Sequence, residues 1–237
     1  MQTSVLESKK DPLGAMLLDY WNGKKQAAVA VACPLLEMSQ MSGRIMFRGA
    51  DQMSPIELKA LALCQGRILD VGAGSGCHSL YLQERNKEVV ALDISPGCIE
   101  VMAKRKVAHR CHNSLFALEN QTYDTLLMLM NGLGICGTLD GLNLFFQCIK
   151  PLLRAGGQVL ADSTDLASFY GNDEIIVQEG GYYGETEFTM GYKDIKGDPF
   201  EWLYIDTVTL AHYAAFHGWQ CDLIMAQDDG KYLVRIH

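Results

Sequence analysis

The sequence has 237 residues, of which 49% are hydrophobic and 20% charged, and its formal net charge is −8. This apolar content excludes disorder as the main state, and a chain of this length can bury a core without disulfide or metal staples. The acidic balance argues against nucleic-acid binding, because a negative surface repels phosphate backbones.

The N-terminus and the cysteines indicate the compartment. The first residues, MQTSVLESKKDP, lack the apolar core of a signal peptide, and the apolar run 27–36 is about half as long as a membrane span. The eight cysteines form no C-x-x-C pair, which is typical of buried free thiols in a reducing compartment. His109, Cys111 and His112 could be considered as metal ligands, but the sequence has no second group of ligand residues at the spacing of a metal site. We therefore expect a cytoplasmic protein without a membrane anchor or a metal.

The first 66 residues have the pattern of a helical region. Apolar residues recur early at helical spacing, at Leu13, Met16, Leu17 and Tyr20. A second helix is indicated over 54–64, because Ser54 suits the N-cap and Glu57 completes a capping box. We expect residues 1–66 to form an N-terminal helical cap, helical from about residue 11, that contributes to the substrate region.

From Arg67 onwards, strands alternate with helices. Short apolar and β-branched runs predict strands over 67–72, 88–93, 107–113, 123–131 and 156–163. Helices are predicted between them over 78–86, 95–106 and 139–153. This alternation predicts a parallel sheet covered by helices on both faces.

The last third has a different pattern. Residues 181–193 and 199–206 alternate polar and apolar side chains around the turn DIKGDP, which predicts a β-hairpin inserted over about 180–206. A helix is predicted from Asp206, its N-cap, to Gly218, and two closing strands follow. The aromatic face of the hairpin is a candidate homodimer contact, and the oligomeric state stays open.

The segment Ile68–Gly76 runs from a strand through a glycine-rich loop into a helix. Glycines 72, 74 and 76 let the backbone turn sharply and let a ligand approach closely. Such a loop at the end of the first strand is where open α/β sheets bind nucleotides. The dinucleotide fingerprint needs a third glycine at position 77, where this chain has Cys77. Asp70 favours a cationic ligand over a pyrophosphate.

The second predicted strand ends in Asp93, 17 residues after Gly76. A carboxylate at this position can accept both hydroxyls of a ribose. The alternative is that Asp93 caps the next helix, but Ser95 already serves as that cap.

Four segments together resemble the class I S-adenosylmethionine-dependent methyltransferases: ILDVGAGSG, VVALDIS, YDTLLMLMN and LLRAGGQVLADS. The resemblance covers about 65–165 and 206–237. It implies a Rossmann-like α/β fold, with a seven-stranded, mostly parallel sheet over 67–237. Two departures are Ala155, where the family often has proline, and Asn113, where it often has aspartate.

The resemblance also implies site residues. Asp70 and the loop would hold the methionine part, Asp93 the ribose, Ile94 the adenine ring, and Asn113 beside Ser114 the adenine amine. Met130 and Asn131 would face the transferred methyl. Ordinary loop polarity is the alternative for both asparagines. The implied loop residues are Gly72, Ala73, Gly74 and Gly76.

Two further side chains are candidates near the methionine part. Arg48 could pair with the methionine carboxylate, although a surface arginine is an equal alternative. His78, in the first turn after the loop, could contact the ligand or substrate, or could have only a capping or packing role.

A methyl group on a sulfonium is already reactive, so the protein needs mainly to align an acceptor and exclude water. A general base is optional, and the sequence indicates no catalytic residue. Candidates for acceptor contacts are Tyr20, Trp21, Tyr182, Tyr183 and Glu185, and packing of the cap onto the core is the alternative for the aromatic ones. We expect a small-molecule acceptor. A non-catalytic cofactor-binding protein and, less strongly, a nicotinamide-dependent oxidoreductase remain alternatives.

Overall fold

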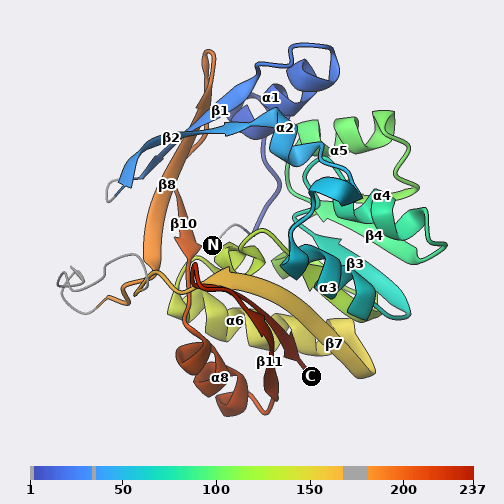
Figure 1. Ribbon diagram of the computed structural model, residues 1–237, viewed down its shortest axis with the longest axis vertical. Helices are drawn as coiled ribbons and strands as arrows, with labels where there is room; N and C mark the ends of the chain where they lie inside the picture. The colour runs from blue at the N-terminus through green and yellow to red at the C-terminus, as the bar shows by residue number, and fades with distance from the viewer. Residues whose placement is uncertain (1–2, 34–35, 168–180) are drawn as a thin grey trace.

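The computed structural model describes residues 3–33, 36–167 and 181–237 (Figure 1). Its central sheet has seven strands in the order β11-β12-β7-β6-β3-β4-β5, and only β12 runs against the others. The strands are β3 (Arg67–Val71), β4 (Glu88–Asp93), β5 (His109–His112), β6 (Tyr123–Met128), β7 (Leu153–Thr164), β11 (Cys221–Ala226) and β12 (Lys231–Ile236). The predicted seven-stranded, mostly parallel α/β sheet is therefore confirmed.

Helices cover both faces of this sheet because successive residues of its buried strands point to opposite sides. Leu69 of β3 packs in a cluster with α6 (Leu139–Ile149) and α8 (Thr207–Phe216). Its neighbour Ile68 packs in another cluster with α3 (Pro55–Leu63) and α4 (Cys77–Gln83). A third cluster involves α5 (Pro96–Lys104).

A second, five-stranded sheet stands beside the central one (Figure 1). Its main order is β10-β8-β1-β2, and β9 pairs with β8. The strands are β1 (Ala28–Cys33), β2 (Leu36–Ser42), β8 (Glu185–Tyr192), β9 (Ile195–Lys196) and β10 (Phe200–Leu203). The predicted hairpin within 180–206 is confirmed, but it does not stand alone, because β8 pairs with β1 from the N-terminal region.

The prediction that residues from about 11 to 66 are helical is wrong over residues 28–42. Helices α1 (Pro12–Trp21), α2 (Gly43–Met46) and α3 are present, but β1 and β2 form an antiparallel pair between them. The run AVAVAC is too short and too uniformly apolar for its periodicity to separate a strand from a buried helix. This run is a strand because it pairs with β8, which is more than 150 residues away in the sequence.

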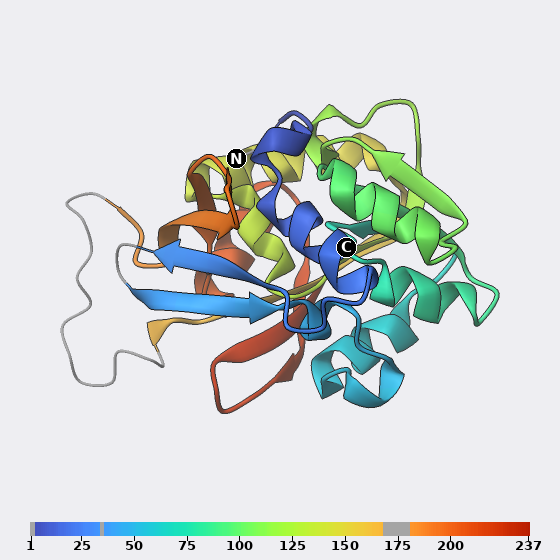
Figure 2. The same ribbon diagram turned by 90° about the horizontal axis from the view of Figure 1, so that it is seen from above.

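The N-terminal region is fixed to the central domain through α1, which lies between the second sheet and α5 (Figure 2). Asp11 caps α1 by accepting the Gly14 N–H at 2.9 Å. The same buried carboxylate accepts the Ser95 hydroxyl at 2.6 Å and the Gly97 N–H at 3.0 Å. Through Asp11, the N-terminal region therefore contacts the loop that follows Asp93.

The eight cysteines are free, and five of them are buried. This confirms the expectation of buried free thiols for those five. Among the described residues, no group of three or more His, Cys, Asp or Glu side chains could hold a metal ion. In the same part of the chain, no helix combines the length and apolarity that crossing a bilayer requires.

Candidate functional site

The glycine-rich loop between β3 and α4 has a backbone that only glycine adopts easily. Gly72, Gly74 and Gly76 have φ values of +69°, +58° and +80°. The Gly72 N–H donates to the Leu92 carbonyl at 2.9 Å, which ties the loop to β4. A Cβ at Gly72 would meet no atom within 4 Å, so this side of the loop is open to a ligand.

Two buried carboxylates lie beside this loop, at the ends of the paired strands β3 and β4. Asp93 accepts the Gly74 N–H at 2.7 Å and the Ser95 N–H at 2.9 Å, and burial raises its pKa to about 6. Asp70 accepts the Ser79 hydroxyl at 2.6 Å, and burial raises its pKa as well. Such groups ionise more easily when a cation or hydroxyl donors approach. The pair therefore suits a cationic adenosyl ligand.

The predicted helix cap at Ser95 is confirmed, because its hydroxyl accepts the Cys98 N–H at 2.9 Å. Asp93 therefore does not cap α5, although it holds the turn that leads into the helix.

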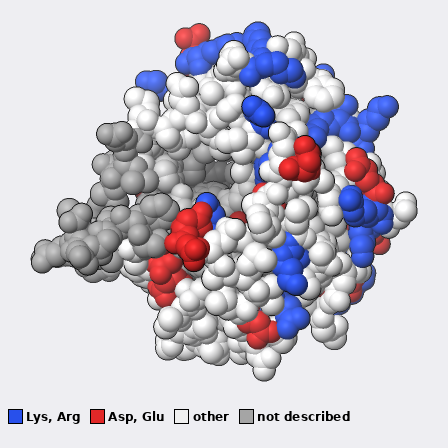
Figure 3. Space-filling view, viewed as in Figure 1, with Lys and Arg blue, Asp and Glu red and all other residues white. Residues whose placement is uncertain are grey.

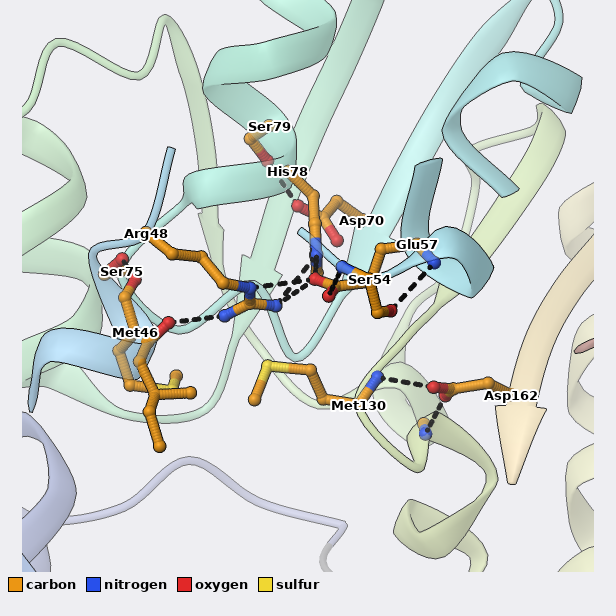
Figure 4. Close-up of polar contacts among 12 residues, drawn as sticks. Met46, Arg48, Ser54, Glu57, Asp70, Ser75, His78, Ser79, Met130 and Asp162 are labelled. Atoms are coloured by element: carbon orange, nitrogen blue, oxygen red, sulfur yellow. Dashed lines mark hydrogen bonds and ion pairs between the residues drawn. The ribbon is translucent and has the colours of Figure 1, made fainter. Parts of the chain in front are cut away.

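Arg48 is not a surface residue, since only 8% of it is exposed. Its guanidinium is paired with Glu57, which lies in the first turn of α3 (Figure 4). His78, at the start of α4, hydrogen bonds to the same Glu57 oxygen through Nε2 at 2.7 Å. Burial alone would raise the pKa of Glu57, but hydrogen bonds from His78, Arg48 and Ser54 lower it to about 2.

Met130 and Asn131 form a tight turn after β6, with left-handed φ values of 67° and 56°. Asp162 of β7 holds this turn by accepting the Met130 N–H at 3.2 Å and the Gly132 N–H at 3.0 Å (Figure 4). Asn131 is engaged with Thr164, whose hydroxyl donates to its Oδ1 at 2.8 Å. Met130 is left with its side chain partly exposed, pointing toward the Arg48 side chain (Figure 4).

The predicted adenine-side residues lie together at the ends of β4 and β5, where Asp93 is in register with His112. Ile94 is half-buried, and its carbonyl accepts the Leu6 N–H at 2.9 Å. Asn113 accepts the N–H of Ser114 at 2.8 Å and donates to the Ala117 carbonyl at 3.4 Å. The Asn113 amide thus hydrogen bonds within its own loop.

The four aromatic acceptor candidates lie in two separate places. Tyr20 and Trp21 stack on Phe47, with ring centroids 4.9 and 6.3 Å away. Tyr182 donates its hydroxyl to Asp206 at 2.7 Å, and Tyr183 donates to Asp165 at 2.6 Å. All four contact their own chain, and 41% of Trp21 is exposed.

Sequence reasoning missed several residues of the site. In the sequence, Glu57 is recognisable only as part of a helix-capping box. Asp162 is recognisable only as a residue of a predicted strand. Trp202 of β10 lies against Gly134 of the short helix η4 (Gly132–Cys136), where a Cβ would be 1.9 Å from the indole Nε1. The second sheet therefore reaches the segment that follows Asn131. The face shown in Figure 3 is hollowed at its centre, between this sheet and the central domain.

Comparison with known proteins gives concordant results. Residues 68–157 match a family model described as a methyltransferase domain. A solved SAM-dependent methyltransferase from Bacteroides fragilis, in complex with S-adenosyl-L-homocysteine, is 44% identical, with a TM-score of 0.90. That match covers 99% of this chain and 98% of the other.

Two further matches are more limited. The DhpI-SAM-HEP complex is 18% identical over 79% of this chain and 86% of its own, with a TM-score of 0.61, which shows a shared fold. Malonyl-[acyl-carrier protein] O-methyltransferase from Serratia marcescens is 44% identical over 43 residues. That alignment spans 18% of this chain and only 17% of the curated relative.

Proposed function

Because this chain belongs to the S-adenosylmethionine-dependent methyltransferases, we propose that it transfers the methyl group of S-adenosylmethionine to a small-molecule acceptor, an activity of class EC 2.1.1. One observation carries the proposal. The open glycine loop is flanked by two buried carboxylates, Asp70 and Asp93, at the ends of adjacent strands.

The residues beside the loop fit the two halves of the cofactor. Asp93 accepts the ribose hydroxyls, with Ile94 and Asn113 on the adenine side. Asp70 and the open loop hold the methionine part, and Arg48 faces its carboxylate. S-adenosylmethionine supplies a methyl group activated by its positive sulfur. The chain has to align the acceptor with that methyl and exclude water.

The acceptor space is bounded by residues 1–66 and the hairpin insertion at about 180–206. This proposal is supported by the pairing of β1 with β8 and by the contact between Trp202 and Gly134, next to the Met130–Asn131 turn. Because the net charge is −8, extended nucleic acids are disfavoured as acceptors. We infer from the buried free thiols that the protein works in a reducing compartment such as the cytoplasm.

A ligand screen tests the proposal. We expect S-adenosylhomocysteine, but not NADH, to raise the melting temperature of the purified protein. Incubation with methyl-labelled S-adenosylmethionine and a metabolite extract should then label a small molecule. Stabilisation by NADH alone would contradict the proposal. Stabilisation by S-adenosylhomocysteine without any labelled product would favour the non-catalytic alternative.

A further inference from the structure

A single buried carboxylate joins three separate segments beside the glycine loop. Oε1 of Glu57 accepts the Arg48 Nε–H at 2.9 Å, a further N–H from Arg48 Nη2, and the His78 Nε2–H at 2.7 Å. Oε2 accepts the Ser54 N–H at 2.8 Å. Arg48, Glu57 and His78 are each less than a tenth exposed. We call these three residues the Arg48 cluster.

Helix capping does not explain this arrangement. The capping box of α3 is complete with Ser54 and Glu57 alone. An ion pair this deeply buried loses hydration on both partners, so it is a weak device for stability. Buried ionisable groups with a shifted pKa, such as Glu57, occur preferentially at functional sites. The burial of Arg48 therefore needs another explanation.

The guanidinium retains donor capacity. Arginine has five N–H groups in a fixed plane. Nε and one N–H of Nη2 donate to Glu57, while Nη1 uses one of its two N–H groups on the Ile45 carbonyl. Nε2 of His78 lies 3.2 Å from Nη2, but a ring nitrogen that donates to Glu57 cannot also accept from Arg48. The second Nη1 N–H has no acceptor among the residues that the structure describes. At least this one fixed donor of a charged group is thus available to a ligand.

The location of this donor is set by the glycine loop. The Ser75 hydroxyl of the loop donates to the carbonyl of Met46, two residues before Arg48. The Met46 side chain lies next to Gly74, since a Cβ there would be 2.6 Å from Cε. His78 lies in the first turn of the helix that leaves the loop. Met130, in the turn after β6, extends toward the guanidinium (Figure 4).

We propose that Glu57 and His78 are positioning residues, which hold the Arg48 guanidinium toward the carboxylate of the cofactor's methionine part. This inference rests on the proposed function. It means that the cluster selects adenosyl ligands that carry the amino-acid part over those that lack it. Glu57 sets the plane of the guanidinium, and His78 holds Glu57 from the side of α4.

The experiment compares two ligands by calorimetry. S-adenosylhomocysteine carries the methionine-derived carboxylate, whereas 5′-methylthioadenosine lacks the amino-acid part. For Glu57→Gln, which keeps the shape but removes the charge, we expect S-adenosylhomocysteine to bind about tenfold or more weakly. Binding of 5′-methylthioadenosine should change less than about twofold. His78→Ala should give the same selective loss, and His78→Gln, which restores a donor, should recover part of it.

Ser54→Ala is the matched control, because it removes the other half of the capping box and leaves Oε1 of Glu57 untouched. In this variant, the ratio of the affinities for S-adenosylhomocysteine and 5′-methylthioadenosine should equal that of the unaltered protein. In an Arg48→Met background, Glu57→Gln should cause no further change in the ratio.

The outcomes distinguish a failure of the positioning role from a failure of the proposed function. If Glu57→Gln and His78→Ala weaken both ligands equally, or leave the ratio unchanged, their positioning role is overturned. If Glu57→Gln does not fold, the His78 pair decides alone. If Arg48→Met itself leaves the ratio unchanged, the contact of Arg48 with the carboxylate is wrong. If neither ligand binds the unaltered protein, the proposed function fails.

Discussion

Gly14 of α1 and Gly97 of α5 bring their backbones into direct contact. A Cβ at Gly14 would be 2.7 Å from the Gly97 Cα, and a Cβ at Gly97 would be 2.5 Å from the Gly14 Cα. This approach lets Asp11 reach the Ser95 hydroxyl and the Gly97 N–H. The N-terminal region is therefore fixed to the loop directly after Asp93, on the proposed ribose side of the site.

Substitution at this crossing should loosen the N-terminal region. We expect Gly97→Ala to lower the free energy of unfolding by about 1–3 kcal/mol, because the neighbour is backbone and cannot move aside cheaply. Urea unfolding measures this. Gly49→Ala is the control, since its Cβ would meet only the rotatable carboxylate of Asp51. Equal stability of the two variants would show that the crossing tolerates a methyl group.

Removal of the Asp93 carboxylate should weaken cofactor binding. We expect Asp93→Ala to reduce the affinity for S-adenosylhomocysteine by about 1–3 kcal/mol, because charged hydrogen bonds to the ribose are left unmade. Calorimetry measures the affinity. Asp51→Ala removes the same charge from an exposed position and should bind normally. Unchanged affinity in Asp93→Ala would remove the ribose assignment.

The raised pKa of Asp93 predicts a pH dependence with a definite sign. The folded, ligand-free protein holds this proton up to about pH 6, whereas an unfolded aspartate loses it near its ordinary value of 3.8. The contribution of Asp93 to stability is therefore complete below about pH 4 and is lost as the pH rises through 6.

Ligand binding should reverse this tendency, because ribose hydroxyls donate to the ionised carboxylate. We expect the affinity for S-adenosylhomocysteine to increase between pH 5 and 7.5. The increase should be smaller in Asp93→Asn than in the surface control Asp51→Asn. Calorimetry across this range measures the effect, and parallel pH profiles for the two variants would contradict it.

The contact between Trp202 and Gly134 should matter for turnover more than for cofactor binding. A Cβ at Gly134 would be 1.9 Å from the indole Nε1, so Gly134→Ala must displace the Trp202 side chain of β10. We expect turnover to fall about tenfold or more, because small misplacements of an acceptor strongly reduce rates. S-adenosylhomocysteine affinity should change less than about threefold. Steady-state kinetics with an identified acceptor measures turnover, and calorimetry measures the affinity for S-adenosylhomocysteine. Equal losses of turnover and affinity would place Gly134 in the cofactor site.

The central domain could be predicted from the sequence because its signals are local. The glycine loop over 72–76, the caps at Ser54, Ser95 and Asp206, and the apolar strand runs all depend on neighbouring residues. Each was found where it was expected. Local hydrogen bonds and side-chain periodicity determine such elements largely on their own.

The rest depended on contacts between distant segments. Strand β1 follows from its pairing with β8, and the burial of Arg48 follows from meeting Glu57 and His78 beside the loop. Likewise, Asp162 belongs to the site only because β7 lies next to β6. Sequence alone determined the family, the glycine loop and the sheet that carries it. The tertiary structure decided which charged side chains face one another, because burial and hydrogen-bond partners exist only once the chain has folded.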